Sequence, residues 1–132
     1  MSIESISEAA RAGLAYERMR LDAASRNIAS ANMPVAPNTS ATRSQVVGVA
    51  SDFSAQIGEP AFAITEQNIE TRTVSEPGHP MADAQGLVHY PKTDLVQEMT
   101  TLVTASRGYE ANVRSFNLLR SMMMKALEIG AK

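Results

Sequence analysis

The chain has 132 residues, of which 44% are hydrophobic and 20% charged, and its net charge is −2. This length favours a single domain, and the balanced charge argues against the phosphate neutralisation that strong nucleic-acid or anionic-membrane binding requires. The absence of cysteine excludes disulfides, thiol nucleophiles and cysteine-ligated zinc. The first residues lack the basic and apolar regions of a secretory signal, and no apolar run is long enough to span a membrane, so we expect no cleaved signal and no membrane insertion.

The six prolines all lie between residues 34 and 91, which leaves a proline-free flank at each end of the chain. Because proline lacks a backbone donor and clashes inside a helix, this distribution predicts a long helix in each flank and an irregular centre. We therefore expect three regions: an N-terminal helical region over residues 1–33, a proline-rich central region with short β-strands over residues 34–91, and a C-terminal helical region over residues 92–132.

A narrow apolar stripe marks the N-terminal region, where residues recur every seven positions at Leu14, Leu21 and Ile28. Alanine is frequent beside them, and small side chains let two helices approach closely. The Met33-Pro34 pair ends the helix, because the residue before proline disfavours the helical conformation. The pattern predicts a helix over residues 4–31, with Ser2 or Ser5 as its N-cap.

Four short segments of the central region are rich in aliphatic, β-branched and aromatic residues and are separated by proline and glycine. They predict strands over residues 45–49, 61–65, 69–74 and 87–90. Strands this short need a helix or another subunit to pack against before they are stable. Residues 33–42 are rich in proline and small polar residues, which predicts a linker that becomes ordered on assembly.

The C-terminal region carries the clearest pattern, with five consecutive heptad positions at Leu95, Leu102, Tyr109, Phe116 and Met123. A second row four residues further on completes a coiled-coil-like seam, at Met99, Ser106, Val113, Arg120 and Leu127. Three consecutive methionines at 122–124 widen the apolar face toward more than one neighbouring helix. A helix of about 36 residues, capped by Thr93 or Asp94, would be about 54 Å long, more than a compact domain of this size needs. The pattern therefore predicts a long helical partner.

Candidate catalytic and metal-binding residues have simpler structural explanations. His79, Asp83 and His89 offer imidazole and carboxylate groups, but their spacing fits no helical ligand pair, so we interpret them as turn residues and predict no metal site. Glu98 has the helical spacing of a solvated flanking position. The sequence contains no glycine-rich phosphate loop and no nucleophile elbow. We therefore expect no enzyme activity, no cofactor and no nucleic-acid partner.

Three motif-like stretches cover most of the chain. The first, residues 21–32, ends the N-terminal helix and holds Asn27 and Asn32. The second, residues 76–91, contains Pro77, Gly78, Pro80, Asp83 and Gly86. The third, residues 98–113, begins with a Glu-Met pair and contains Arg107, Tyr109 and Asn112. Together they resemble the flagellar basal-body rod proteins of bacteria, within the flagellar axial protein family, and among them the C component of the proximal rod.

The resemblance implies a structural subunit of the proximal rod of the bacterial flagellar basal body, which polymerises with other rod proteins and copies of itself through its terminal helices and transmits motor torque. It also implies synthesis in the cytoplasm, type III export without a cleaved signal, and a final place in the rod that crosses the periplasm. The basal-body ring and the export apparatus are expected further contacts. The sequence departs from the family at residues 33–37, where Thr-x-Gly usually follows the first motif.

Pattern and resemblance lead to the same expected fold. We expect a mainly α protein with a small central β region, whose long terminal helices pair in a coiled-coil-like arrangement, antiparallel or near-parallel, and are completed on assembly. The apolar rows named above are the expected helix-packing and assembly interface, with Asn27, Asn32 and Asn112 as polar register contacts. The free monomer is expected to keep these helices largely disordered, because ordering costs about 1–2 kcal/mol per residue and no intrachain core matches their length.

Two hypotheses from other classes stay open at this point. A soluble helical adaptor or export chaperone of a type III secretion system would keep its helical hairpin monomeric or dimeric and never enter the rod. A metal-dependent hydrolase would need both His79 and His89 as ligands. Sedimentation with rod proteins and metal uptake, respectively, separate these hypotheses from a rod subunit.

Overall fold

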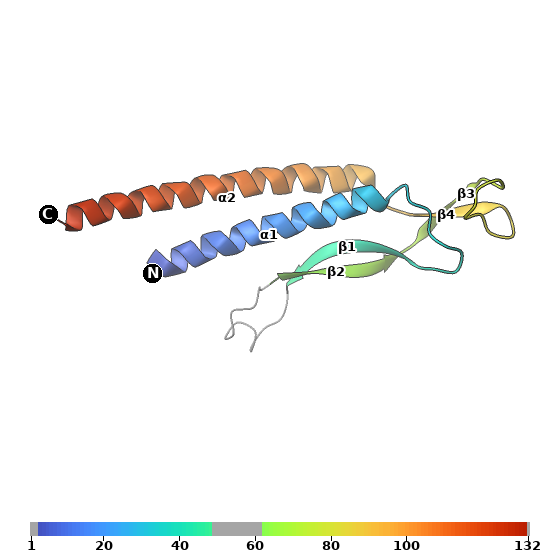
Figure 1. The fold of residues 1–132 in the computed structure, drawn as a ribbon, viewed down its shortest axis with the longest axis horizontal. Coiled ribbons are helices and arrows are strands. Elements are labelled where there is room, and N and C mark those ends of the chain that lie inside the picture. The colour runs from blue at the N-terminus through green and yellow to red at the C-terminus, as the bar shows by residue number, and fades with distance from the viewer. Residues whose placement is uncertain (1–2, 49–61, 132) are drawn as a thin grey trace.

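A computed structural model of the chain describes residues 3–48 and 62–131. The molecule is elongated, with two long helices side by side, one small antiparallel sheet along them and a second beyond one end of the helix pair (Figure 1). The expectation of a mainly α protein with a small β region is confirmed. No helix in the described ranges combines the length and the apolarity that a membrane crossing would require.

Both predicted helices form. Helix α1 covers Ile3–Ser30, and helix α2 covers Leu95–Gly130, with 36 residues. Asp94 is the N-cap of α2, since its Oδ1 accepts hydrogen bonds from the backbone N–H groups of Val96 and Gln97 at 3.0 and 3.2 Å. These bonds satisfy two of the donors that the first turn of a helix leaves without an intrahelical partner.

The predicted strands form two antiparallel pairs. The first pair is β1, Ala41–Gly48, with β2, Phe62–Ile69, and the second is β3, Thr71–Ser75, with β4, Leu87–Pro91. The predicted strand over residues 69–74 is divided at Glu70, because Ile69 completes β2 and Thr71 begins β3. Two expected strand residues, Val49 and Ala61, lie outside the described residues, as does the expected helix cap Ser2.

The segment over residues 33–42 is attached to β4 within the single chain. The backbone N–H of Val35 donates to the carbonyl of His89 at 2.8 Å, and β1 begins at Ala41, inside the predicted linker. Asn38 has φ = 67°, a left-handed conformation that asparagine tolerates better than most residues. The segment therefore connects α1 to β1 while it is bonded to β4.

The two helices run antiparallel and come close at two glycines. A Cβ atom on Gly13 of α1 would lie 3.1 Å from Asn112 Nδ2 of α2, and a Cβ atom on Gly108 would lie 2.8 Å from Glu17 Oε1. Residue numbers therefore rise along α1 as they fall along α2. The absence of a side chain at both glycines permits this close approach, which compensates for their low helix propensity.

The buried apolar core is small. Among the described residues, its members are five alanines and one valine, at Ala23, Ala24, Ala31, Ala41, Val88 and Ala105. The β1–β2 hairpin also contacts α1 through Tyr16 and Phe62, whose ring centroids are 4.7 Å apart. Since stabilisation by burial scales with the apolar area removed from water, so small a core favours a marginally stable single chain.

Candidate assembly surface

The row of α2 that faces α1 lies three residues after the first heptad row, and not four. The two members of this row nearest the N-terminus of α2, Glu98 and Ala105, are buried, with 2% and 0% of their surface exposed. Further along α2, Asn112 lies against Gly13, and Leu119 lines a groove together with Ile6 of α1. The face of α2 that packs against α1 therefore consists of a glutamate, an alanine, an asparagine and a leucine.

The first predicted row lies along the edge of this contact. Leu95, Leu102 and Phe116 are half-buried, whereas Tyr109 and Met123 are 37% and 38% exposed. The predicted α1 stripe, Leu14, Leu21 and Ile28, is likewise half-buried. These apolar side chains are thus only partly covered by the chain itself.

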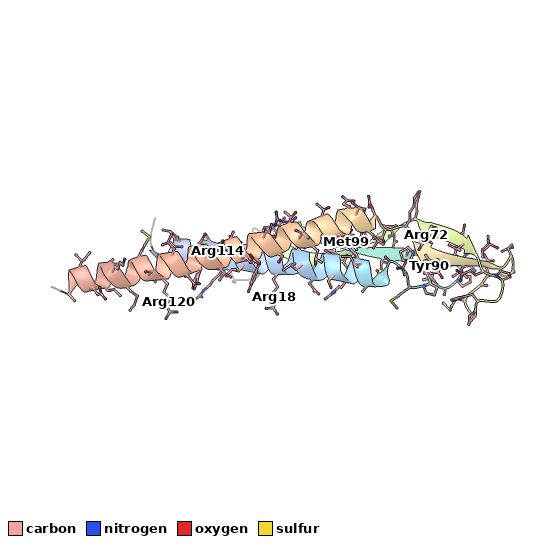
Figure 2. All side chains as sticks on the ribbon, turned by 90° about the horizontal axis from the view of Figure 1, so that it is seen from above. Arg18, Arg72, Tyr90, Met99, Arg114 and Arg120 are labelled. Carbon is pink, nitrogen blue, oxygen red and sulfur yellow. The ribbon has the colours of Figure 1, made fainter. Side chains whose placement is uncertain are left out.

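The second predicted row, which we call the outward row, is mostly uncovered. Met99 is 51% and Leu127 is 69% exposed, Arg120 is exposed, and Ser106 and Val113 are half-buried. Figure 2 shows side chains projecting along the whole of α2, with Met99, Arg114 and Arg120 spread over its length. The role of these residues in assembly stays a prediction, and the structure leaves several of them free to contact another molecule.

The C-terminal end of α2 extends past the N-terminal end of α1 (Figure 1). We call residues 124–130 the overhang. Every residue from 121 to 131 is exposed, and the large apolar side chains of the overhang reach 57%, 69% and 78% exposure at Met124, Leu127 and Ile129. Val96, Val103, Leu118 and Met122 are further exposed apolar side chains of α2, and exposed apolar side chains in such number are typical of interaction sites.

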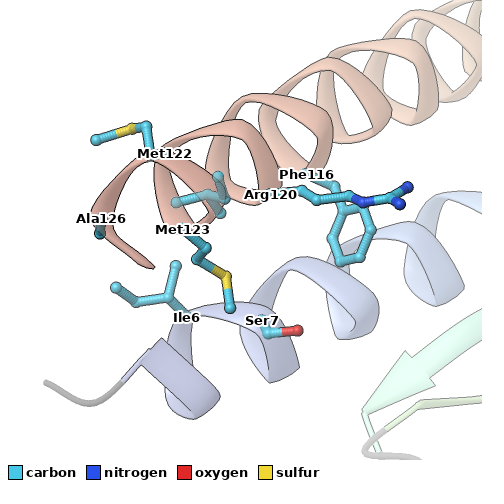
Figure 3. Close-up of a pocket in the computed structure, with 8 residues that line it drawn as sticks. Ile6, Ser7, Phe116, Arg120, Met122, Met123 and Ala126 are labelled. Atoms are coloured by element: carbon cyan, nitrogen blue, oxygen red, sulfur yellow. The ribbon is translucent and has the colours of Figure 1, made fainter. Parts of the chain in front are cut away.

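An apolar groove of about 380 Å³ lies between the first turns of α1 and the C-terminal half of α2 (Figure 3). Two residues of its wall are polar, Ser7 and Arg120. The others are aliphatic, aromatic or thioether side chains, at Ile6, Phe116, Leu119, Met122, Met123 and Ala126. Methionine side chains are flexible and adapt to the surface that contacts them. The groove and the overhang are continuous along the same end of α2, because Ala126 of the overhang also belongs to the groove wall.

A group of polar residues, which we call the polar joint, connects α1, β1 and α2. Glu98 Oε1 accepts a hydrogen bond from Arg43 Nε at 2.6 Å, and Oε2 accepts one from Asn27 Nδ2 at 3.2 Å. Asn27 also bonds both backbone groups of Ser44, accepting from its N–H at 2.8 Å and donating to its carbonyl at 2.9 Å. The interpretation of Glu98 as a solvated flanking residue is therefore wrong, because β1 folds over this position and supplies its cation.

The other two predicted register asparagines have different surroundings. Asn32 Oδ1 accepts a hydrogen bond from Arg72 at 3.4 Å, and the guanidinium of Arg72 also lies 4.8 Å from the ring centroid of Tyr90. Asn112 lies within the helix pair, against Gly13. The structure brings only Asn27 into a buried network, and the role of all three in register stays a prediction.

The motif over residues 76–91 forms a turn that Asp83 holds together. Its Oδ1 accepts from the backbone N–H groups of Gln85 and Leu87, both at 2.9 Å, and its Oδ2 lies 3.0 Å from His89 Nε2. Gly86 has φ = 76°, and a Cβ there would lie 3.0 Å from Pro77 Cβ, so the turn requires glycine at this position.

The remaining predicted residues of this motif, Gly78 and Pro80, are exposed, as is Arg107 on α2. His79 Nδ1 accepts a hydrogen bond from the backbone N–H of Met81 at 3.0 Å, so it serves the turn locally. Within residues 3–48 and 62–131, no group of three or more carboxylate or imidazole side chains is arranged to hold a metal ion.

The Asp83 turn should lose its hydrogen bonds in acid. The N–H of Leu87 and then the imidazole of His89 hold the pKa of Asp83 below its ordinary value of 3.8. A lowered pKa means that this carboxylate stabilises the turn above its unfolded pKa, and that the contribution is lost as pH falls through the folded pKa. We expect the amide resonances of Gln85 and Leu87 to shift together in an NMR titration below pH 4, and Asp83→Asn to remove the transition. Amide resonances that stay constant through this range would contradict the assignment.

Comparison with known proteins gives a consistent result. The family model described as "Flagellar basal body rod FlgEFG protein C-terminal" matches residues 84–129, which include β4 and nearly all of α2. The flagellar basal-body rod protein FlgC of Salmonella typhimurium is 35% identical over 98% of this chain and 99% of its own length. The protein of the same name from Borreliella burgdorferi is 29% identical over 98% of this chain and 98% of its own length. The one from Bacillus subtilis is 44% identical over 55% of this chain and 49% of its own length.

Proposed function

The chain belongs to the flagellar basal-body rod protein family and is a structural subunit of the rod, and we propose that it builds the proximal rod through its two terminal helices. The helices join those of other rod proteins and of further copies of the same chain, and the assembled helices transmit motor torque. This role is not enzymatic and uses no cofactor.

The observation that carries this proposal is the apolar surface that α2 leaves uncovered. Met99 of the outward row, and Leu127 and Ile129 of the overhang, are more than half exposed in the single chain. Removing such side chains from water contributes about 25 cal/mol for each Å² buried, so a neighbouring helix that covers them stabilises the subunit and the contact at once. Family membership supplies the kind of neighbour, namely other rod subunits.

Coiled-coil-like pairing then involves more than one molecule. Leu102 and Phe116 lie at the edge toward α1, while Met99 and Leu127 are available to the helix of an adjoining subunit. Arg120 interrupts the outward row, and a polar residue in an apolar seam selects register and partner at some cost in stability. In this arrangement the terminal helices are completed only in the assembled rod.

We expect a dilute free chain to have much less helix than the 28 and 36 residues of α1 and α2. Ordering costs about 1–2 kcal/mol per residue, and a core of alanines with one valine offsets little of it. Circular dichroism at micromolar concentration checks this expectation. Full helicity at that concentration would show that the chain folds without a partner, and it would contradict the expected disorder of the terminal helices.

A double substitution in the overhang, Leu127→Glu with Ile129→Glu, should block incorporation into the rod. Because both side chains are exposed, the far-UV spectrum of the free chain should match that of the unsubstituted chain, with a stability change within about 0.5 kcal/mol. Immunoblots of isolated basal bodies measure incorporation. The matched control is Lys125→Glu, which places acid on the same overhang without removing an apolar side chain, and normal incorporation of the double variant would contradict an interface there.

Localisation and partners extend the proposal. We infer that the subunit is made in the cytoplasm, is exported by the flagellar type III apparatus with an uncleaved N-terminal signal, and takes its place in the rod where it crosses the periplasm. Contacts with the basal-body ring and the export apparatus belong to the same proposal. A helical adaptor would remain outside the rod, so co-sedimentation with basal bodies separates it from a rod subunit.

A further inference from the structure

The polar joint combines a buried charge with partners from two other elements. Glu98 is only 2% exposed and Asn27 only 3%, whereas the Arg43 side chain is 30% exposed. No buried side-chain nitrogen or oxygen atom in the described part of the chain lacks a hydrogen-bond partner. The joint is therefore fully satisfied, but only while α1, β1 and α2 are all in place.

Removing any one element leaves polar groups without partners. If the β1–β2 hairpin lifts away, Arg43 and Ser44 leave together because they are consecutive on β1, so Glu98 loses its cation and Asn27 loses two backbone partners. If α2 leaves instead, Arg43 and Asn27 both lose Glu98. Water replaces these partners on the side that opens, so a partly assembled arrangement loses the net contribution of the charge-assisted hydrogen bonds, and any group that the remaining elements still cover also carries a desolvation cost.

We propose that the polar joint makes seating of the β1–β2 hairpin and pairing of α1 with α2 a single cooperative event. Glu98 is a positioning residue in this event, since it contacts one residue on each of the other two elements. The direction of the hairpin is thereby fixed relative to the helices at the moment when the helices pair. The inference concerns ordering within one subunit and goes beyond the contacts that hold the rod together.

Two cysteine pairs report the two events separately, because the chain has no cysteine of its own. Tyr16→Cys with Phe62→Cys reports hairpin seating, where the two rings now contact. Gly13→Cys with Asn112→Cys reports helix pairing at a site about 21 Å along α1 from Asn27. The readout is the effective concentration of each thiol pair, measured against glutathione in the full chain, with trimethylamine N-oxide added to favour the folded state.

The deciding variant is Arg43→Met, which removes a charge from the hairpin and touches neither reporter pair. We expect the effective concentration to fall about tenfold for both reporters, including the one between the helices. Glu98→Gln, which keeps the shape of the side chain, should lower both reporters in the same proportion. A helix reporter that keeps its original value while the hairpin reporter falls would overturn the proposal, as would two unchanged reporters.

Two controls separate the joint from general damage. Arg107→Met removes an exposed arginine of α2 and should change neither reporter. Phe62→Ala loosens the hairpin at its aromatic contact without touching the joint, so it should lower the helix reporter while the joint is intact and should change it less than about twofold when combined with Arg43→Met. If Phe62→Ala lowers the helix reporter equally with and without Arg43→Met, ordinary packing couples the elements and the joint has no special role.

Discussion

Replacing Leu102 with aspartate should abolish incorporation of the subunit into the rod. Leu102 is half-buried on α2, one turn from the fully buried Ala105, and lines a groove with Leu21 of α1. Losing the half-buried leucine contact costs about 1 kcal/mol, and the new carboxylate must also be desolvated or expelled. Both effects act where α1 and α2 meet, so neither the helix pair nor a neighbour's contact with its edge can form.

The experiment is complementation of a strain that depends on this chain, with motility and the composition of isolated basal bodies as readouts. Thr104→Asp is the matched control, because it adds the same charge to an exposed position of α2 whose hydroxyl bonds only the Thr100 carbonyl of its own helix. The control should incorporate normally. A motile strain with Leu102→Asp subunits in its rods would count against helix packing as the basis of assembly.

Replacing Glu98 with alanine should lower the free energy of unfolding by about 3 kcal/mol, at the low end for a buried ion pair because Arg43 is partly exposed. The change removes the acceptor of both Arg43 and Asn27. Since the buried core is small, the single chain has no stability in reserve, and the loss disfavours its folded state further. Incorporation should fall for the same reason.

Folding of the full chain by trimethylamine N-oxide measures this loss as a shift of the midpoint to higher osmolyte concentration. Glu110→Ala is the control, because Glu110 is exposed on the same helix, and its midpoint should stay close to that of the unsubstituted chain. A Glu98→Ala midpoint equal to that of the control would mean that the buried ion pair contributes nothing net.

The ends of the helices were predictable because they depend on local chemistry. Pro34 and the turn before it end α1, and the Asp94 side chain caps α2 through its own neighbours. Strand positions followed from composition in the same way, although the break at Glu70 did not, because pairing with two different strands decides it. Local signals therefore located every described element to within a few residues, apart from the early start of β1 and the late end of β2, each four residues beyond the predicted bound.

The face that α2 turns to α1 was not predictable from apolar periodicity. Glu98 and Asn112 lie on that face, and neither is apolar, so a search for apolar rows passes over them. Glu98 was assigned to solvent because the sequence does not show that β1 returns over α1 and brings Arg43 to it. Glu98 and Asn27 are polar residues on helix faces that also carry alanines, which is only a weak signal for the polar joint in the sequence. The joint is visible only in the contacts between residues far apart in the chain.

The fold and the function follow from the same imbalance. The chain has two long helices but buries mainly alanine between them, and the larger apolar side chains of α2 lie at its edge, on its outward row and in the overhang. A subunit with this distribution gains more from neighbours than from its own core. In the function proposed above, assembly provides both the stability of the helices and the continuity that a torque-bearing rod needs.

A density map of the assembled rod tests this account most directly. In such a map we expect Met99, Leu127 and Ile129 to contact helices of adjoining subunits, and we expect side chains of a neighbour to fill the groove beside Phe116. A map in which these side chains face open solvent within an intact rod would contradict it.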